Sequence, residues 1–148
     1  MSTVLLLNGP NLNLLGKREP HLYGKATLQE IESSFKELAA TFELKADCIQ
    51  SNSESELIES IHVAPSKGTE AIVINPGAFG HTSVALRDAF LGTGIPFVEI
   101  HISNVFAREA FRSKSLLSDI AIGLISGFGE KSYELGLQAI LAYLQKQD

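Results

Sequence analysis

The apolar residues of this chain follow two spacings that alternate along its length. Short apolar or loosely alternating runs predict β-strands at 4–7, 44–50 and 71–74, a fourth strand that begins at 95, and a fifth at 120–125. Apolar residues spaced by three and four predict amphipathic helices over 28–42, about 54–67, about 82–91 and 133–144. Capping boxes precede two of these helices, Thr27 with Glu30 and Ser53 with Glu56, and Gly92 and Gly94 are expected to end the third.

The third predicted strand, 71–74, is a continuous apolar run without polar alternation. A strand of this kind is covered on both faces, so it is expected at the centre of a parallel sheet. Five strands that alternate with helices predict an α/β fold, a doubly wound five-stranded parallel sheet of order 2-1-3-4-5 with helices on both faces. In that order the winding reverses between strands one and three, and a ligand crevice is expected at their carboxyl ends.

The loop at about 9–24 is too long for a plain strand-to-helix connection, which needs about 2 to 6 residues. It carries Asn11, Arg18 and Tyr23 between glycines and prolines that punctuate and stiffen the backbone. We interpret the loop as an active-site lid, with the apolar run 14–16 as a movable cover.

Composition narrows the classes of function. The 148 residues, 45% of them hydrophobic, predict one domain, 1–148, with one substantial core. The formal net charge of -5 gives no general attraction to nucleic acid or an anionic membrane, so a few placed cations must hold any anionic ligand. A single cysteine, Cys48, and the lack of a signal peptide or a membrane-spanning run predict a cytoplasmic protein.

The fourth strand carries the first candidate pair. Side chains alternate along a strand, so Phe97, Glu99 and His101 are expected on one face. A carboxylate beside an imidazole fixes its tautomer and raises its basicity, which makes His101 a candidate general acid or base. The alternative is that His101 is a structural histidine in the core and that Glu99 is only its hydrogen-bond partner. We favour a general acid or base because glutamate is rarely buried without an ion-pair partner or a functional role, and this pair lies at the predicted crevice.

Tyr23 taken alone is typical of a surface tyrosine. Arg18 lies in the same loop, however, and a guanidinium beside a phenol favours the phenolate, which can act as a base. Lys17 is interpreted as a solvated charge near Glu19.

The glycine-rich turn at 75–81 follows strand three and belongs to the same predicted edge of the sheet. His81 enters a helix, where N–H groups and the helix dipole favour anions, so it is expected to contact a ligand. Asn75 is a further ligand candidate or a simple turn residue. Arg108 and Arg112 are four apart after the fourth strand, so one of them is a candidate carboxylate clamp, and a solvated face explains the spacing equally well.

Several familiar motifs are missing from the sequence. It has no G-x-G-x-x-G after a strand, no P-loop, no G-x-S-x-G and no metal-ligand cluster, and 127–129 is only a weak phosphate-site candidate. Asp88, inside the third helix, and His21 and His62 are interpreted as surface residues. A cofactor-free proton transfer on a small polar anion is the chemistry that remains.

Four linked blocks of sequence, taken together, are a more specific signal than any one of them. The opening block is L-N-G-P-N-L-N-L-L-G at 7–16, with R-E-P at 18–20 and Y-G at 23–24. The later blocks are N-P-G-A at 75–78 with H-T-S at 81–83, E-I-H-I-S-N at 99–104, and A-R-E at 107–109 with F-R at 111–112. Together these blocks resemble the type II 3-dehydroquinases, and the resemblance covers nearly the whole chain. It implies a flavodoxin-like fold and reversible anti dehydration of 3-dehydroquinate to 3-dehydroshikimate through an enolate, without Schiff base, metal or other cofactor.

The resemblance also implies roles for particular residues. Tyr23 matches the base, assisted by Arg18, His101 matches the acid, oriented by Glu99, and Asn11 matches the residue that holds the enolate. The positions that match substrate-binding residues are Asn75, His81, Ile102, Ser103 and Arg112. Asp88 matches a residue that reaches the neighbouring subunit's site in a trimer, and four trimers form a homododecamer. Departures from the family pattern stand at Phe106, Lys114 and Leu116.

Two alternatives stay open at this point. One is a quinate-catabolic role for the same reaction in place of a biosynthetic one. The other is a flavodoxin-like module that binds a nucleotide or transmits a signal, since fold does not determine function. The loop after strand one lacks a phosphate cradle, and strand one does not end in aspartates, which argues against the second.

Overall fold

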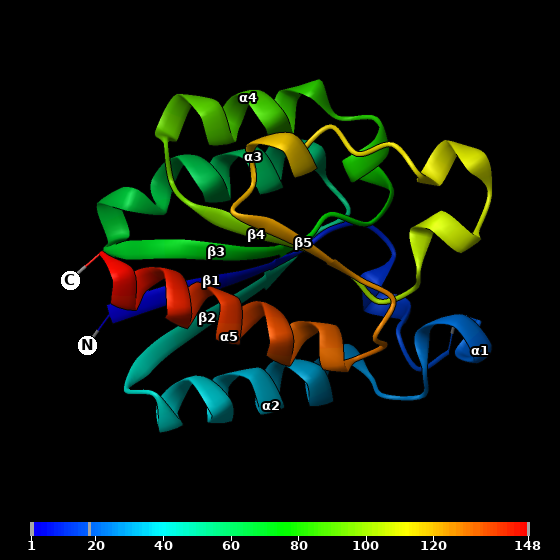
Figure 1. Ribbon diagram of the computed structural model, residues 1–148, viewed down its shortest axis with the longest axis horizontal. Coiled ribbons are helices and arrows are strands. Elements are labelled where there is room, and N and C mark those ends of the chain that lie inside the picture. The colour runs from blue at the N-terminus through cyan, green and yellow to red at the C-terminus, as the bar shows by residue number, and fades with distance from the viewer. Residues whose placement is uncertain (1, 18, 148) are drawn as a thin grey trace.

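A five-stranded parallel sheet forms the centre of the molecule (Figure 1). The computed structural model describes residues 2–17 and 19–147. The strands are β1 (Ser2–Asn8), β2 (Leu44–Gln50), β3 (Thr69–Asn75), β4 (Phe97–His101) and β5 (Gly123–Ser126). They pair in the order β2-β1-β3-β4-β5, and each neighbouring pair is parallel, which confirms the predicted class and strand order.

Helices cover both faces of the sheet. In Figure 1, α2 (Leu28–Thr41) and α5 (Lys131–Lys146) lie below it, and α3 (Glu54–Val63) and α4 (Val84–Thr93) lie above it. Alternation along the strands divides the core accordingly. Leu6, Val73 and Ile100 pack on the α2 and α5 side, and Leu7 and Phe97 on the other.

The predicted caps hold the helices in place. The Thr27 hydroxyl accepts a hydrogen bond from the backbone N–H of Glu30 at 3.2 Å, and the Ser53 hydroxyl accepts one from Glu56 at 3.3 Å. Each cap satisfies an N–H that has no partner within the helix.

The boundaries of several elements differ from the predictions. The first long helix stops at Thr41. The third starts at Val84 rather than 82, because 3-10 turn η3 (Gly77–His81) precedes it, and it continues through Gly92 to Gly94, whose φ of 70° ends it. Strand β4 begins at 97, and β5 begins at 123 because η6 (Ser118–Ile120) occupies the start of the predicted run.

The loop at 9–24 is folded rather than irregular. It contains η1 (Leu12–Leu14) and a single-turn helix, α1 (Pro20–Tyr23). Leu15 is buried in the core on the α2 and α5 side, whereas Leu14 is exposed. Leu15 thus packs in the core in this structure, and the movable cover stays a prediction.

Other single-turn 3-10 helices shape the remaining connections. They are η2 (Pro65–Lys67), η4 (Val105–Ala107) and η5 (Ala110–Arg112). In Figure 1, α1 and the yellow segment after β4 lie beyond the same end of the sheet, opposite the two chain termini. This arrangement places the long loop and the arginine-bearing turns beside the carboxyl ends of the strands.

Gly9 brings the ends of β1 and β3 together. Its N–H donates to the carbonyl of Asn75 at 2.8 Å, and a Cβ at Gly9 would lie 2.3 Å from the carbonyl oxygen of Pro76. We expect Gly9→Ala to lower the free energy of unfolding by about 1–3 kcal/mol, because backbone must shift to admit the methyl group. Urea unfolding measures the change.

Gly92→Ala is the matched control. Gly92 lies inside α4, and an added Cβ meets no atom within 4 Å. This variant should be more stable than the parent by about 0.5–1 kcal/mol, because alanine favours the helix. Equal stability of Gly9→Ala and the parent protein would contradict the close approach at Gly9.

Cys48 on β2 faces an environment that disfavours its thiolate. Burial raises the pKa of the Cys48 thiol to about 12, and the nearby carboxylates of Glu32 and Asp47 add to the increase while Lys36 opposes it. Because the thiolate is the nucleophile, alkylation at pH 8 should be about 10²- to 10³-fold slower in the native protein than in denaturant. Mass spectrometry after timed iodoacetamide treatment measures both rates, and equal rates would contradict this environment.

Candidate active site

A cavity of about 200 Å³ lies at the carboxyl ends of β1, β3 and β4. Its lining residues are Pro10, Asn11, Leu12, Tyr23, Asn75, Gly77, Ala78, His81, His101, Ile102, Ser103, Val105, Arg108 and Arg112. A larger hollow of about 570 Å³ lies between α2 and α5, but it contains none of the predicted site residues. We take the smaller cavity as the site because titratable and amide side chains converge there.

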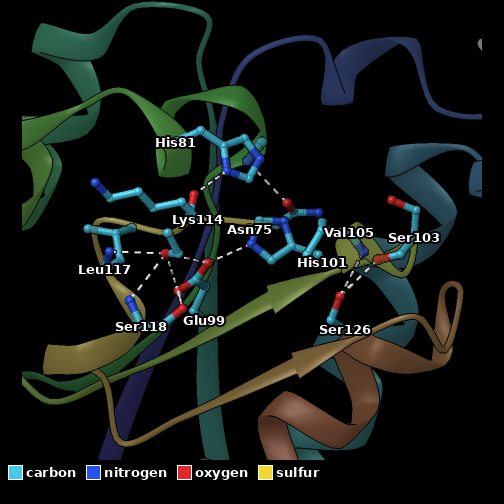
Figure 2. Close-up of polar contacts among 12 residues, drawn as sticks. Asn75, His81, Glu99, His101, Ser103, Val105, Lys114, Leu117, Ser118 and Ser126 are labelled. Atoms are coloured by element: carbon cyan, nitrogen blue, oxygen red, sulfur yellow. Dashed lines mark hydrogen bonds and ion pairs between the residues drawn. The ribbon is translucent and has the colours of Figure 1, made fainter. Parts of the chain in front are cut away.

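Glu99 and His101 form the buried pair that the strand alternation predicted. The Nε2 atom of His101 lies 2.6 Å from Oε2 of Glu99, and both side chains are buried. Ser115 donates to both carboxylate oxygens at 2.9 and 3.0 Å, and Ser118 donates to Oε1 at 2.6 Å. Figure 2 shows Glu99 between Ser118 on one side and His101 on the other.

The polar partners of Glu99 determine its charge. Burial alone would raise its pKa, but the hydrogen bonds from His101, Ser118 and Ser115 outweigh burial and hold the pKa of the carboxyl below its usual range. Glu99 is therefore ionised and only accepts hydrogen bonds, so Nε2 of His101 carries a hydrogen. A proton available to a ligand from charged His101 is then the one on Nδ1.

His81 stacks on His101, with ring centroids 6.0 Å apart. Its Nδ1 atom lies 2.8 Å from the carbonyl oxygen of Lys114. A carbonyl only accepts, so Nδ1 of His81 carries a hydrogen. This hydrogen bond fixes the orientation of the His81 ring. His81 lines the cavity at the predicted edge of the sheet.

Tyr23 meets Arg108, a residue that sequence reasoning left open. Arg108 donates from Nη1 to the Tyr23 hydroxyl oxygen at 2.7 Å and to the Ser103 hydroxyl at 3.1 Å. Only 11% of the Arg108 side chain is exposed, and its guanidinium lies over the Tyr23 ring, 5.3 Å from the centroid. Arg18, the predicted partner of Tyr23, lies outside the described residues.

Arg112 also lines the cavity, although Arg108 and Arg112 do not share the face of a helix. The segment forms the separate turns η4 and η5, not one helix. Arg112 donates from Nε and Nη2 to the Glu109 carboxylate at 3.2 and 3.4 Å, and 20% of its side chain is exposed. A guanidinium at this position can meet a carboxylate ligand.

Asn11 reaches the cavity through an unusual backbone conformation. Its φ of 68° is in the left-handed region, which asparagine tolerates better than most residues. The Asn11 N–H donates to Oδ1 of Asn52 at 2.9 Å. Gln50 donates from Nε2 to the Gly9 carbonyl at 3.1 Å and to the same Asn52 oxygen at 3.2 Å. The end of β2 thus braces the first loop, a contact that the sequence analysis missed.

Asn75 is both buried and oriented. Its Nδ2 donates to the Tyr133 hydroxyl at 2.9 Å, and its Oδ1 accepts from the N–H of Gly77 at 3.2 Å. Tyr133 in turn donates to Oδ1 of Asn8 at 2.7 Å. This chain of bonds leaves one Nδ2 hydrogen of Asn75 for a further acceptor.

The end of β4 is held by groups on β5 and the turn after it. Ser126 accepts from the N–H of Val105 at 3.3 Å and donates to the Ser103 carbonyl at 3.0 Å (Figure 2). The N–H of Gly127 donates to the carbonyl of His101, and that of Gly129 to the carbonyl of Ile102. The weak phosphate-site prediction at 127–129 is therefore wrong, because these amides bind the backbone beside the cavity.

Asp88 is placed apart from the cavity. It is exposed on α4 and does not contribute to the cavity lining. His21 and His62 are exposed, as predicted. Among residues 2–17 and 19–147, no group of three or more His, Cys, Asp or Glu side chains is arranged to hold a metal ion. None of the helices in that part of the chain combines the length and the apolar character of a membrane span.

The fold and this cavity define an α/β protein with imidazole, phenol and guanidinium groups gathered at the carboxyl edge of its sheet. The family model described as "Dehydroquinase class II" matches residues 2–141. A 3-dehydroquinate dehydratase from Teredinibacter turnerae is 58% identical over 146 residues, which cover 99% of this chain and 95% of that protein. The chain belongs to the class II dehydroquinase family.

Further relatives agree with this assignment. The catabolic 3-dehydroquinase 2 of Aspergillus flavus is 57% identical over 144 residues, which cover 97% of this chain and 95% of that protein. The crystal structure of type II dehydroquinase from Propionibacterium acnes superimposes with a TM-score of 0.91 at 39% identity and covers 96% of this chain and 97% of that one. The family thus includes a relative named for a catabolic role, and similarity alone does not distinguish the two roles.

Proposed function

We propose that this chain dehydrates 3-dehydroquinate to 3-dehydroshikimate and water, with Tyr23 as the base and His101 as the acid. The similarity to 3-dehydroquinate dehydratases supports the reaction. The observation that carries the residue roles is one small cavity lined by both Tyr23, bonded to Arg108, and His101, bonded to Glu99. The reaction needs no metal ion and no nucleotide.

The first step removes a proton from the carbon beside the substrate carbonyl. Arg108 places a positive charge 2.7 Å from the Tyr23 oxygen, and an adjacent cation favours the phenolate over the phenol. Arg18 acts as a second cation in this proposal. The Tyr23 phenolate accepts the proton, the electrons of the C–H bond move into an enolate, and Asn11 stabilises the enolate oxygen.

The second step expels the hydroxyl group. Charged His101 protonates the departing oxygen from Nδ1, the C–O bond breaks, and the enolate electrons form the new double bond. Glu99 receives the Nε2 hydrogen bond throughout and stabilises the imidazolium charge. Tyr23 ends protonated and His101 neutral, so both exchange protons with solvent before the next turnover.

The remaining cavity residues bind the substrate in this proposal. Arg112 offers a guanidinium to the carboxylate, which is how a chain of net charge -5 holds an anion. Asn75 and His81 are oriented by their own partners. Asn75 presents its second Nδ2 hydrogen to a substrate oxygen, and His81, whose hydrogen is on Nδ1, presents Nε2 as an acceptor to a substrate hydroxyl. Ile102 and Ser103 contribute the wall at the end of β4.

We further propose that the subunits form trimers and that four trimers form a homododecamer. Val84, Asp88 and Leu91 share one face of α4, because they are spaced by four and three. Val84 is 57% and Leu91 56% exposed, which leaves an apolar surface beside the Asp88 carboxylate. Packing of this face against a neighbour would bury the apolar groups and bring Asp88 to that neighbour's site.

The direct test is an ultraviolet assay of the purified protein with 3-dehydroquinate. The product is an enone and absorbs in the ultraviolet, whereas the substrate does not. We expect turnover that survives dialysis against a chelator. Lack of turnover by folded protein would overturn the proposed reaction.

A mixing experiment tests the shared site. We expect Asp88→Ala and Tyr23→Phe each to lose most activity, and oligomers that contain both variants to recover part of it. Recovery follows because some sites then combine an intact Tyr23 with an intact Asp88 from the neighbour. Co-expression with two different tags isolates the mixed oligomers, and native mass spectrometry gives their size. Activity equal to the mean of the two parents would contradict a site shared between subunits.

A further inference from the structure

The segment 113–120, here called the serine strap, crosses the end of the sheet and is attached to the elements above it. The N–H of Leu116 donates to the carbonyl of Gly80 at 2.8 Å. Arg87 on α4 donates to the Leu116 carbonyl at 3.0 Å and pairs with Asp119. Leu117 is fully buried in the core on the α3 and α4 side. These contacts hold the strap in one position over Glu99.

Ser115 has no freedom in the direction of its hydroxyl hydrogen. Its oxygen accepts from the N–H groups of Leu117 at 3.0 Å and Ser118 at 3.2 Å. A hydroxyl oxygen has two acceptor sites and one hydrogen, so the hydrogen of Ser115 must point to the Glu99 carboxylate. The strap backbone therefore presents Ser115 as a donor only.

Ser118 completes the arrangement on the other side of the carboxylate. Its hydroxyl donates to Oε1 of Glu99 at 2.6 Å, while His101 lies at Oε2. Glu99 is thus buried among two hydroxyl donors and one imidazole. Without the hydroxyl donors, burial would favour the neutral carboxyl and draw the shared proton from His101 to Glu99.

From this geometry we infer that Ser115 and Ser118 are positioning residues that keep Glu99 anionic and so keep the shared proton on His101. The catalytic consequence rests on the proposed function, in which His101 must be charged to act as the acid. The charge state of Glu99 itself does not depend on that function. The serine strap thereby acts on His101, the proposed proton donor, through Glu99.

Other polar and charged groups face the same pair from neighbouring elements. His81 stacks on His101 from η3, and Tyr23, Arg108 and Arg112 line the cavity from α1 and the turns after β4. The Ser115 and Ser118 substitutions remove none of these groups. A change in Glu99 ionisation in such variants therefore reports the loss of the hydroxyl donors.

The test compares Ser115→Ala, Ser118→Ala and the double variant with the parent protein, without substrate. Carbon-13 NMR of labelled glutamate carboxyls, with Glu99→Gln to assign the signal, follows the ionisation of Glu99. We expect its titration midpoint to rise by about one pH unit or more in the double variant. Ser118→Thr keeps a hydroxyl and should restore the parent midpoint, and Ser60→Ala, which removes a hydroxyl bonded to the Glu56 carbonyl on α3, should change nothing.

Kinetic measurements distinguish the effect of the two serines on Glu99 from the role of His101 as the acid. At a pH below both Glu99 midpoints we expect kcat to be about tenfold lower in the double variant than in the parent, with KM within about twofold, because there a rise of one unit in the midpoint lowers the ionised fraction about tenfold. An unchanged Glu99 midpoint in Ser118→Ala and the double variant would overturn the inference. A raised midpoint with unchanged kcat at that low pH would support the serine role and instead contradict His101 as the acid. If the double variant does not fold, the comparison of Ser118→Ala with Ser118→Thr decides the question.

Discussion

Replacement of Tyr23 by phenylalanine is expected to lower kcat by about 10²- to 10⁴-fold, the usual contribution of a positioned general base. The ring remains in place and keeps its packing beside Arg108, so the fold and KM should change little. The ultraviolet assay gives kcat and KM, and circular dichroism verifies the fold. The rate should also lose its rise with pH on the acid side, because no phenol then has to ionise.

Tyr143→Phe provides the matched control. Tyr143 lies on α5 and is only partly buried, outside the cavity lining. Its variant should keep the parent's kcat and pH profile. Full activity of Tyr23→Phe would exclude Tyr23 as the base and would leave the position of Arg108 without a catalytic explanation.

Replacement of His101 by alanine is the second large effect. We expect kcat to fall by about 10²- to 10⁴-fold, because the hydroxyl group must then leave without a positioned acid. In the parent, activity requires Tyr23 deprotonated and His101 protonated, which gives a bell-shaped pH profile. The variant should keep the acid side of the bell and lose the decline on the alkaline side.

Stability must be measured in the same experiment. Removal of His101 leaves the buried Glu99 carboxylate with two hydroxyl donors and no imidazole, and breaking a buried charge pair costs about 3–5 kcal/mol. His62→Ala, at an exposed position on α3, serves as the control and should behave like the parent. A parent profile that stays flat across neutral pH would argue against the Tyr23 and His101 pair, provided that substrate isotope effects show the proton transfer to be rate-limiting.

The departures from the family pattern fall where backbone makes the contacts. Lys114 binds His81 through its carbonyl, and Leu116 binds Gly80 and Arg87 through its N–H and carbonyl. Phe106 is exposed on η4. Other side chains at positions 114 and 116 would leave the same backbone bonds, and the side chain at position 106 is exposed, which explains how the site accommodates these residues.

The fold was predictable because its signals are local. The apolar run in β3 and the alternation of helices and strands determine a parallel sheet, and right-handed crossovers leave few strand orders. The alternation along β4 also placed Glu99 and His101 on one face, two residues apart. Boundaries were missed at α4 and β5, where short 3-10 turns carry apolar residues that resemble the start of the regular element.

The partners within the site were not predictable in the same way. Arg108 meets Tyr23 across 85 positions of sequence, Asn52 meets Asn11 across 41, and Tyr133 meets Asn75 across 58. Spacing rules describe neighbours within one element and contain no information about such contacts. Arg108 and Arg112 are four apart, a spacing that would place both on one face only if the segment were helical, and the structure has two separate turns there.

The sequence by itself determined the class of fold, the edge of the sheet where the site lies, and the residue types that the chemistry needs. The tertiary structure decided which groups meet there: Arg108 at the phenol, the strap hydroxyls at Glu99, and Asn52, which follows β2, at Asn11. The physical reason is that backbone propensity and hydrophobic burial act over a few residues and fix the elements. Hydrogen-bond partners and the charge of a buried group depend on the packing of whole elements, which only the folded chain defines.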